Sequence, residues 1–174
     1  MQQPSSSLLK IAIPAYRWHT QMFDNMLKDI NDEQSAIRVE GRTNNIIWTL
    51  GNLVNCRYWM AGVLGIEEKD PNDALFKEGK AYDPASTYPS LDSFKTSWHS
   101  ISKKLFEKLM LATDEQLTQP HEFGMSVPFM EENKLNMIGM GMDRCGYLLG
   151  QLALLRRAVA NIGTQYDIDD KINY

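Results

Sequence analysis

The residues best suited to chemistry lie in the last third of the chain, in the apolar stretch from Leu135 to Leu155. Two charged residues, Asp143 and Arg144, stand side by side at its centre. On a helix of about 3.6 residues per turn, the face that carries Arg144 also carries Met137, Gly141, Leu148, Gln151 and Leu155. An unpaired buried charge is strongly destabilising, so we expect Arg144 to be buried against an anion or several carbonyl groups.

The other candidate ligands are spread along the sequence. His19, His99 and His121 fall in separate segments, and none has a second histidine at metal-ligand spacing, so each is interpreted as a solvated or core side chain. Cys56 and Cys145 form no CxxC motif and lie in apolar helical contexts, which favours buried free thiols in a reducing cytosol. A zinc site built on the two thiols would lack a histidine or carboxylate, and it is the weaker alternative.

Four long helices are predicted to position these side chains in one domain. Hydrophobic periodicity places them at about 8–30, 44–64, 91–112 and 131–160, within a single domain of residues 1–174. The long polar connection at 66–89 implies a crossover in the middle of the chain. The fold class is therefore predicted to be all-α, a four-helix bundle. The polar residues after Gly163 are expected to be peripheral.

Local signals set the expected ends of these helices. Thr43 and Ser90 are predicted N-caps, and Gly65 is a predicted C-terminal glycine. The segments Asn31–Gln34 and Thr113–Gln116 each have the pattern of a capping box, so a short helical turn is expected at both.

Composition excludes several classes of function. The chain has 174 residues, a formal net charge of −4 and no basic run, which argues against nucleic-acid binding. The segment Leu135–Leu155 is long enough to span a bilayer, but its two central charges argue against a membrane segment. The N-terminal residues MQQPSSSLLK have no charged n-region or long apolar h-region, so no signal peptide is expected. These features favour a cytoplasmic protein.

Two short motifs resemble those of the DinB-like (damage-inducible) proteins. The segment Trp48–Val54 reads W-T-L-G-N-L-V, where that family has G-H-L in its second helix. The segment Tyr147–Leu152 resembles the end of the family's last-helix motif, H-E-x-Y-H-x-G-Q-L. The Asp-Glu-Gln turns and the entry at Tyr88–Leu91 are also similar to this family. The resemblance covers nearly the whole chain and implies a DinB/YfiT-like metalloenzyme fold with up-down-down-up helices.

The same resemblance implies that the family's metal site has been lost. Three histidines in that family hold a divalent metal such as zinc or nickel. The matching positions here are Asn52, Arg144 and Leu148. Leu148 has no donor atom and Arg144 is a fixed cation that repels a metal, so we expect no metal and no other cofactor.

Two functions remain open at this point. The first is a metal-free binding or scaffold protein for a small anionic molecule, in a pocket lined by Trp48, Asn52, Cys56, Arg144, Tyr147, Leu148 and Gln151. Asp24 is an alternative counter-charge for Arg144. The second is a transferase or isomerase similar to the family's thiol-dependent enzymes, which use the metal to activate a low-molecular-weight thiol. The missing ligands count against an enzyme.

Glycines in the last helix suggest close packing. Gly139, Asp143, Gly146 and Gly150 share one stripe, which predicts either the close approach of a neighbouring helix or a second subunit. Because many members of the family are dimers, the resemblance implies a homodimer. We also expect the surviving motif residues to pack together where the second helix meets the last, with Gly150 at a tight contact. These residues are Trp48, Gly51, Tyr147, Gly150 and Gln151.

Overall fold

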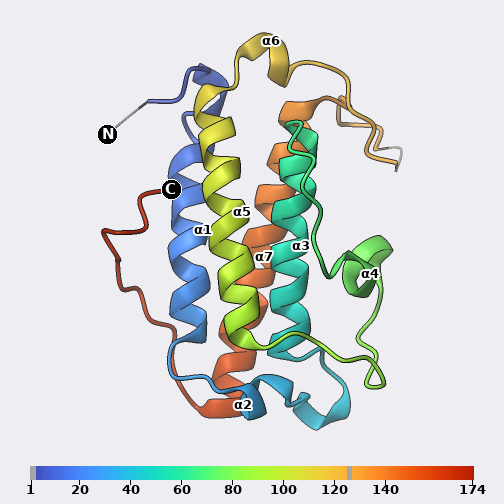
Figure 1. The fold of residues 1–174 in the computed structure, drawn as a ribbon, viewed down its shortest axis with the longest axis vertical. Helices are drawn as coiled ribbons and strands as arrows, with labels where there is room; N and C mark the ends of the chain where they lie inside the picture. Colours follow the sequence, from blue (N-terminus) through green and yellow to red (C-terminus); the bar gives the residue numbers. More distant parts are fainter. Residues whose placement is uncertain (1–2, 125–126) are drawn as a thin grey trace.

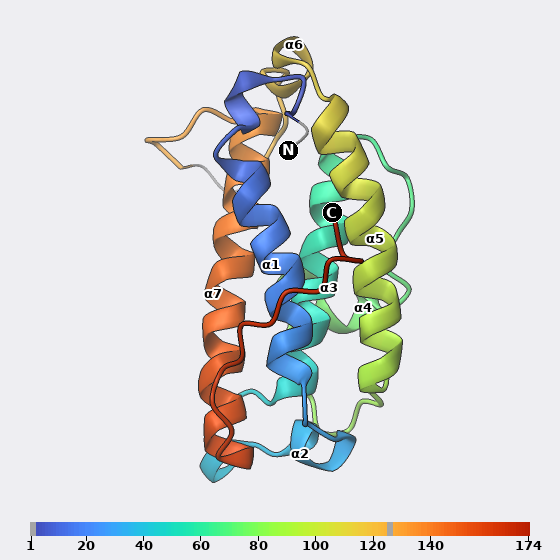
Figure 2. The ribbon, with the colours of Figure 1, turned by 90° about the vertical axis from the view of Figure 1, so that its left-hand side faces the viewer.

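The computed structural model describes residues 3–124 and 127–174, and within them the regular structure is all-helical. Four long helices lie side by side (Figure 1). They are α1 (Ala12–Leu27), α3 (Ile46–Val63), α5 (Leu91–Leu111) and α7 (Lys134–Ala160). α1 and α7 run in one direction, and α3 and α5 run in the other (Figures 1 and 2). The prediction of an all-α protein is confirmed.

Short elements occupy the connections. Three are α-helical turns, α2 (Asp32–Ala36), α4 (Asp73–Phe76) and α6 (Asp114–Leu117), and three are 3-10 turns at Ser7–Leu9, Val39–Gly41 and Lys77–Gly79. The connection from α3 to α5 carries α4 and returns the chain from one end of the helices to the other (Figure 1). Over the described residues, no helix combines the length and the apolar character needed to cross a lipid bilayer.

Most of the predicted caps are confirmed. Both capping boxes form, so α2 and α6 begin as expected, and Ser90 caps α5 by accepting a hydrogen bond from the Ser93 amide. The prediction for Thr43 is wrong, because Asn45 caps α3 and accepts from the Trp48 amide at 2.9 Å. Thr43 Oγ1 accepts instead from the Val39 amide at 3.0 Å, which closes the loop before α3.

The first predicted helix is divided in two. A 3-10 turn at Ser7–Leu9 precedes α1, which starts at Ala12 and has Pro14 in its first turn. Proline is tolerated there because its missing amide hydrogen would have no partner inside the helix. α1 ends at Leu27, and Asp29 then adopts a left-handed φ of 63° that turns the chain toward α2.

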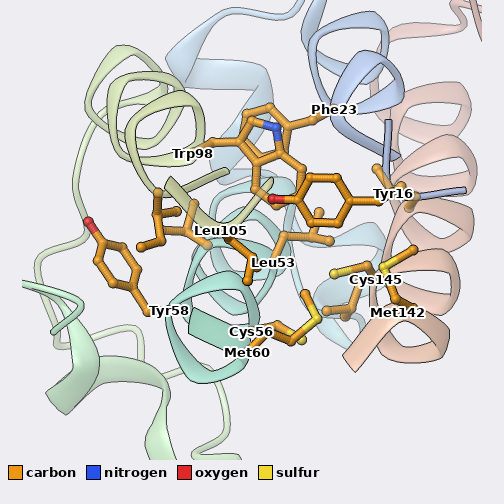
Figure 3. Close-up of a cluster of buried hydrophobic side chains, with 14 of the residues drawn as sticks. Tyr16, Phe23, Leu53, Cys56, Tyr58, Met60, Trp98, Leu105, Met142 and Cys145 are labelled. Atoms are coloured by element: carbon orange, nitrogen blue, oxygen red, sulfur yellow. The ribbon is translucent and has the colours of Figure 1, made fainter. Parts of the chain in front are cut away.

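The core lies between the four long helices, and α5 supplies the stripe that its periodicity predicted. The stripe consists of Phe94, Trp98, Ile101, Leu105 and Leu109, all of which are buried. At its centre the Trp98 ring stacks on Phe23 of α1, with ring centroids 4.4 Å apart (Figure 3). Stacked aromatic pairs in a core add to the burial energy of each ring, so this contact ties α1 to α5.

Gly51 fixes the long connection to the side of α3. A Cβ atom at Gly51 would lie 1.9 Å from the nearest atom of the Phe76 ring, so this ring lies directly on the α3 backbone. The Phe76 side chain is buried and meets Tyr88 and Phe94, with centroid separations of 6.0 and 6.1 Å. The connection is therefore held to α3 and α5 by one aromatic anchor.

The segment after Gly163 lies at the surface, as expected, and side chains of the helices hold it there. Residues 161–174 run back along α1 toward α5 (Figure 2). Gln21 donates to the carbonyl groups of Asp169 and Ile172, both at 2.9 Å, and the Tyr174 hydroxyl lies 3.0 Å from Nδ1 of His99. Polar side chains on the outer face of α1 thus satisfy backbone groups of this segment and hold it in place.

Candidate functional site

Arg144 and Asn52 meet where α7 crosses α3. Nη2 of Arg144 donates to Oδ1 of Asn52 at 3.0 Å, as the sequence predicted. Asn52 is 2% exposed, and its Nδ2 donates to the Trp48 carbonyl at 3.0 Å. The prediction that Arg144 is buried is wrong, because its side chain is exposed. The residue lies at the edge of the buried stripe, and its long stem carries the guanidinium to solvent while one nitrogen reaches Asn52.

Asp24 is not a counter-charge for Arg144. Its carboxylate pairs with Nε2 of His99 at 3.0 Å, between α1 and α5. Among the described residues, Arg144 has no carboxylate within 4.0 Å. Apart from its hydrogen bond to Asn52, the Arg144 guanidinium is therefore open to solvent.

The seven predicted site residues all belong to α3 and α7, but their side chains differ widely in solvent exposure. Asn52, Cys56 and Leu148 are buried, Trp48 and Gln151 are half-buried, and Arg144 and Tyr147 are exposed, Tyr147 to 66%. Gln151 lines a shallow hollow of about 180 Å³ together with Thr43, Asn44, Leu154 and Leu155. Arg144 and Tyr147 thus face solvent instead of enclosing a ligand.

The predicted tight contact at Gly150 is wrong. Gly150 is exposed, and a Cβ atom there would meet nothing within 4 Å; the same holds at Gly139. Close approach of α7 to α3 occurs instead at Gly141, where a Cβ atom would lie 2.4 Å from the Met60 side chain. The glycines that permit close packing are therefore Gly141 on α7 and Gly51 on α3.

Two buried arginines were missed from the sequence. Arg57 of α3 lies between the rings of Tyr16 and Trp98, with its Cζ 3.6 and 4.5 Å from their centroids. It is fully buried and donates to the Tyr16 carbonyl at 3.4 Å, while its Nε and Nη1 have no partner among the described residues. The sequence does contain an indication of this role, because Arg57 is the one charged residue in the α3 sequence.

The second missed residue is Arg156, near the end of α7. It is fully buried and donates to backbone carbonyl groups of Met26, Lys28 and Gly163. Burial lowers the pKa of this guanidinium. The side chain therefore caps the C-terminal end of α1 and fastens it to α7.

The two thiols meet across the same pair of helices. Cys56 and Cys145 are free and buried, as predicted, and both lie in the core between α3 and α7 (Figure 3). The interaction between the two thiols raises the pKa of Cys56 and lowers the pKa of Cys145. The charges of Arg57 and Arg144 lower the pKa of Cys145 further. Cys145 is therefore the thiol that ionises more readily.

His19 of α1 faces α7 at Gly146. A Cβ atom at Gly146 would lie 3.5 Å from Nε2 of His19, and the buried Nδ1 of His19 has no partner within the described part of the chain. Burial lowers the pKa of His19 to about 4, and the charge of Arg57 acts in the same direction. The His19 ring is therefore neutral at physiological pH, and the neutral form is the one that the buried position favours.

A groove lies at the end of the helices where α3 and α5 finish and α7 begins. This groove of about 540 Å³ is bounded by α3, α5, α6 and α7 and by the segments that follow them. Its apolar wall consists of Leu64, Ile66, Leu111 and Ala112, and its polar rim consists of Lys104, Glu107, Lys108, Gln116, Gln119 and Lys134. No local pattern in the sequence indicated this groove, because its lining comes from four separate segments.

The residues at the positions matched to the DinB-like metal ligands do not fit a metal. Asn52 Oδ1 is already occupied by the Arg144 guanidinium, and Leu148 presents only carbon atoms. Across the described residues, no three His, Cys, Asp or Glu side chains form a cluster that could hold a metal ion. The arrangement at the α3–α7 crossing is a hydrogen-bonded and apolar contact between helices.

Comparison with known proteins gives no relative. No family model, no curated protein and no solved structure matches this chain.

Proposed function

We propose that this chain is a metal-free binding protein for a small amphipathic anion, which it holds in the groove between α3, α5, α6 and α7. The observation that carries the proposal is a hollow of about 540 Å³ that joins an apolar wall to a rim of lysines. Ligand sites usually have volumes of about 300–1,000 Å³ and combine apolar walls with a few polar groups. The ligand class is the one expected from the sequence, at a different place on the fold.

The charge of the rim favours an anion. Three lysines and one glutamate border the groove, although the chain as a whole has a net charge of −4. Lys104 pairs with Glu68, and Lys134 donates to Gln119 at 2.8 Å. Among the described residues, neither Lys108 nor Lys134 has a carboxylate within 4.0 Å. These two ammonium groups are therefore available to a carboxylate or phosphate.

The apolar wall favours a ligand with a hydrocarbon body. Leu111 is 71% exposed at the edge of the groove, and Leu64 and Ile66 are half-buried beside it. Covering such surface stabilises a complex by about 25 cal/mol per Å² of apolar area removed from water. A chain or ring on this wall with its charged end toward Lys108 and Lys134 would use both parts of the groove.

Calorimetric titration with decanoate tests the proposal. Decanoate is expected to bind at least about tenfold more tightly than decanol, which lacks the charge, and than butyrate, which lacks most of the chain. The double variant Lys108→Gln, Lys134→Gln is expected to lose about tenfold in decanoate affinity. Lys103→Gln is the matched control, since Lys103 is an exposed lysine of α5 that does not line the groove. Equal affinity of parent and double variant, or equal binding of decanol, would overturn the proposal.

The DinB-like resemblance remains part of the proposal, as a four-helix bundle with up-down-down-up helices. Its support is the direction of the four long helices and the contact between Asn52 and Arg144 (Figure 1). In the family, both positions belong to histidines that share one metal. Leu148 lies one helical turn after Arg144, at the i, i+4 spacing that places two imidazoles on one face.

Restoring the three histidines tests this resemblance. The parent protein, exposed to zinc or nickel and then desalted, is expected to retain no stoichiometric metal. The variant Asn52→His, Arg144→His, Leu148→His is expected to retain about one equivalent, measured by elemental analysis. A double variant that keeps Leu148 serves as the control and should bind much more weakly. A folded triple variant without metal would count against the resemblance.

The alternative function is a thiol-dependent transferase or isomerase of the same family. It requires a metal that activates a low-molecular-weight thiol, and Asn52, Arg144 and Leu148 do not fit one. About one equivalent of zinc or nickel in the parent protein would favour this enzyme over the binding protein.

A further inference from the structure

We propose that Cys56 and Cys145 form a reversible disulfide, produced by a hydroperoxide, that pins α3 to α7. The pair lies outside the groove proposed for the anion, so the two proposals rest on different residues. The Cys56 Sγ atom lies 3.5 Å from the carbonyl oxygen of Gly141, one turn before Cys145 on α7, so the two thiols are neighbours in the contact between α3 and α7 (Figure 3). The disulfide would join positions 56 and 145 and close the chain between them into a covalent loop.

α3 and α7 approach each other closely beside the two thiols. Gly141 of α7 leaves no room for a Cβ atom against Met60 of α3, and the Cys56 thiol donates to the Gly141 carbonyl at 3.5 Å. Cys145 lies one turn after Gly141, and Cys56 lies one turn before Met60, so both thiols occupy the narrow part of the crossing (Figure 3). Disulfides need Cα atoms within about 7 Å, so the close approach at Gly141 favours this bond.

Two cations favour Cys145 as the attacking sulfur. Arg57 is fully buried, two of its nitrogen atoms have no partner among the described residues, and its charge and that of Arg144 both act on Cys145. The interaction between the thiols lowers the pKa of Cys145 and raises the pKa of Cys56. One thiol is therefore arranged to react with the oxidant and the other to resolve the product.

The reaction balances with hydrogen peroxide as oxidant. The Cys145 thiolate attacks one oxygen, an S–O bond forms, the O–O bond breaks, and hydroxide leaves and takes a proton to become water. The Cys56 sulfur then attacks the sulfenic acid of Cys145, an S–S bond forms, and the S–O bond breaks. The hydroxide released takes the Cys56 proton. Two thiols lose two electrons in all, and the peroxide becomes two waters.

Burial selects the size of the oxidant. Cys145 has no exposed surface and Cys56 is 4% exposed, so the oxidant must enter through small fluctuations of the α3–α7 contact. Hydrogen peroxide is about as small as water, whereas a peptide disulfide such as oxidised glutathione is far larger. The folded protein is therefore expected to react with peroxide and to resist oxidised glutathione.

Mass spectrometry of the native full chain tests the proposal. Treatment with hydrogen peroxide is expected to lower the mass by about 2 Da, the loss of two hydrogen atoms, and dithiothreitol should restore it. Tryptic digestion without reduction is expected to yield one species that joins peptides 43–57 and 145–156. Two thiols that still alkylate in denaturant after oxidation, a disulfide-linked dimer, or a mixed disulfide with glutathione would overturn the proposal.

Single-cysteine variants test the order of the two steps. In Cys56→Ala, the sulfenic acid of Cys145 has no resolving thiol, so it should be captured by dimedone. Cys145→Ala is the matched control and should give several-fold less dimedone adduct on Cys56. A reversed ratio between the two variants would contradict the assignment of Cys145 as the attacking sulfur. The disulfide in the parent chain is tested independently of either variant.

Discussion

Replacement of Gly51 by alanine is expected to destabilise the protein by more than about 2 kcal/mol. The new Cβ would lie 1.9 Å from the Phe76 ring, and the ring has little room to move because Tyr88 and Phe94 pack against it. Either the ring moves and opens a cavity, or α4 separates from α3. Urea unfolding monitored by circular dichroism measures the change as a lower midpoint with a similar slope.

Gly150→Ala is the matched control for this experiment. Gly150 is an exposed helical glycine, and an added methyl group would meet nothing within 4 Å, so alanine should stabilise the protein by up to about 1 kcal/mol through helix propensity. The double variant Gly51→Ala, Phe76→Leu should be destabilised by less than the sum of its two single changes, because leucine relieves the clash. Additive effects, or a Gly51→Ala midpoint equal to the parent's, would contradict the aromatic anchor.

The stability of the protein is expected to decrease by about 3 kcal/mol between pH 6.5 and pH 4 because of His19 alone. Burial and the charge of Arg57 lower the pKa of His19 from 6.5 to about 4 in the folded state. Between these values the unfolded chain binds a proton at this residue and the folded chain does not. The free energy contributed by neutral His19 is therefore complete above pH 6.5 and is lost as the pH falls toward 4.

Urea unfolding at a series of pH values measures this effect. His19→Gln removes the titrating group, so the decline in unfolding free energy over the same range should be about 3 kcal/mol smaller than in the parent. The NMR titration of the His19 ring in the folded parent provides an independent measurement, with an expected midpoint near 4. A midpoint near 6.5, or parallel stability curves for parent and variant, would show that the ring is not buried in its neutral form.

The helices were predictable because their signals are local. The stripe of α5, the two capping boxes and the Ser90 cap depend on residues within a few positions of each other, and all are confirmed. The end of α1 and the start of α3 were less predictable, since Asp29 and Asn45 respond to the turns around them. Local chemistry thus decides where most elements lie, and tertiary contacts adjust their ends.

The site was harder to predict because burial depends on neighbouring helices. The α7 periodicity correctly places Arg144 on the side facing Asn52, but a helical wheel cannot show that this position lies at the edge of the contact. The same wheel argument applied to α3 would have marked Arg57, whose neighbours Tyr16 and Trp98 come from two other helices. Residues from separate segments come together only when the chain folds. The lysine-bordered groove was not predicted for the same reason, since four segments line it.

The order of the helices has a consequence for the rate of folding. α1 packs against α7, and the bond from Arg156 to the Met26 carbonyl joins residues 130 positions apart. Isolated helices form within about a microsecond, but the packing energy of α1 against α7 is gained only after a loop of most of the chain has closed. Helical proteins whose spatial neighbours are also neighbours in sequence avoid that entropic barrier. The meeting of the first and last long helices is therefore the step expected to limit how fast this chain reaches its native state.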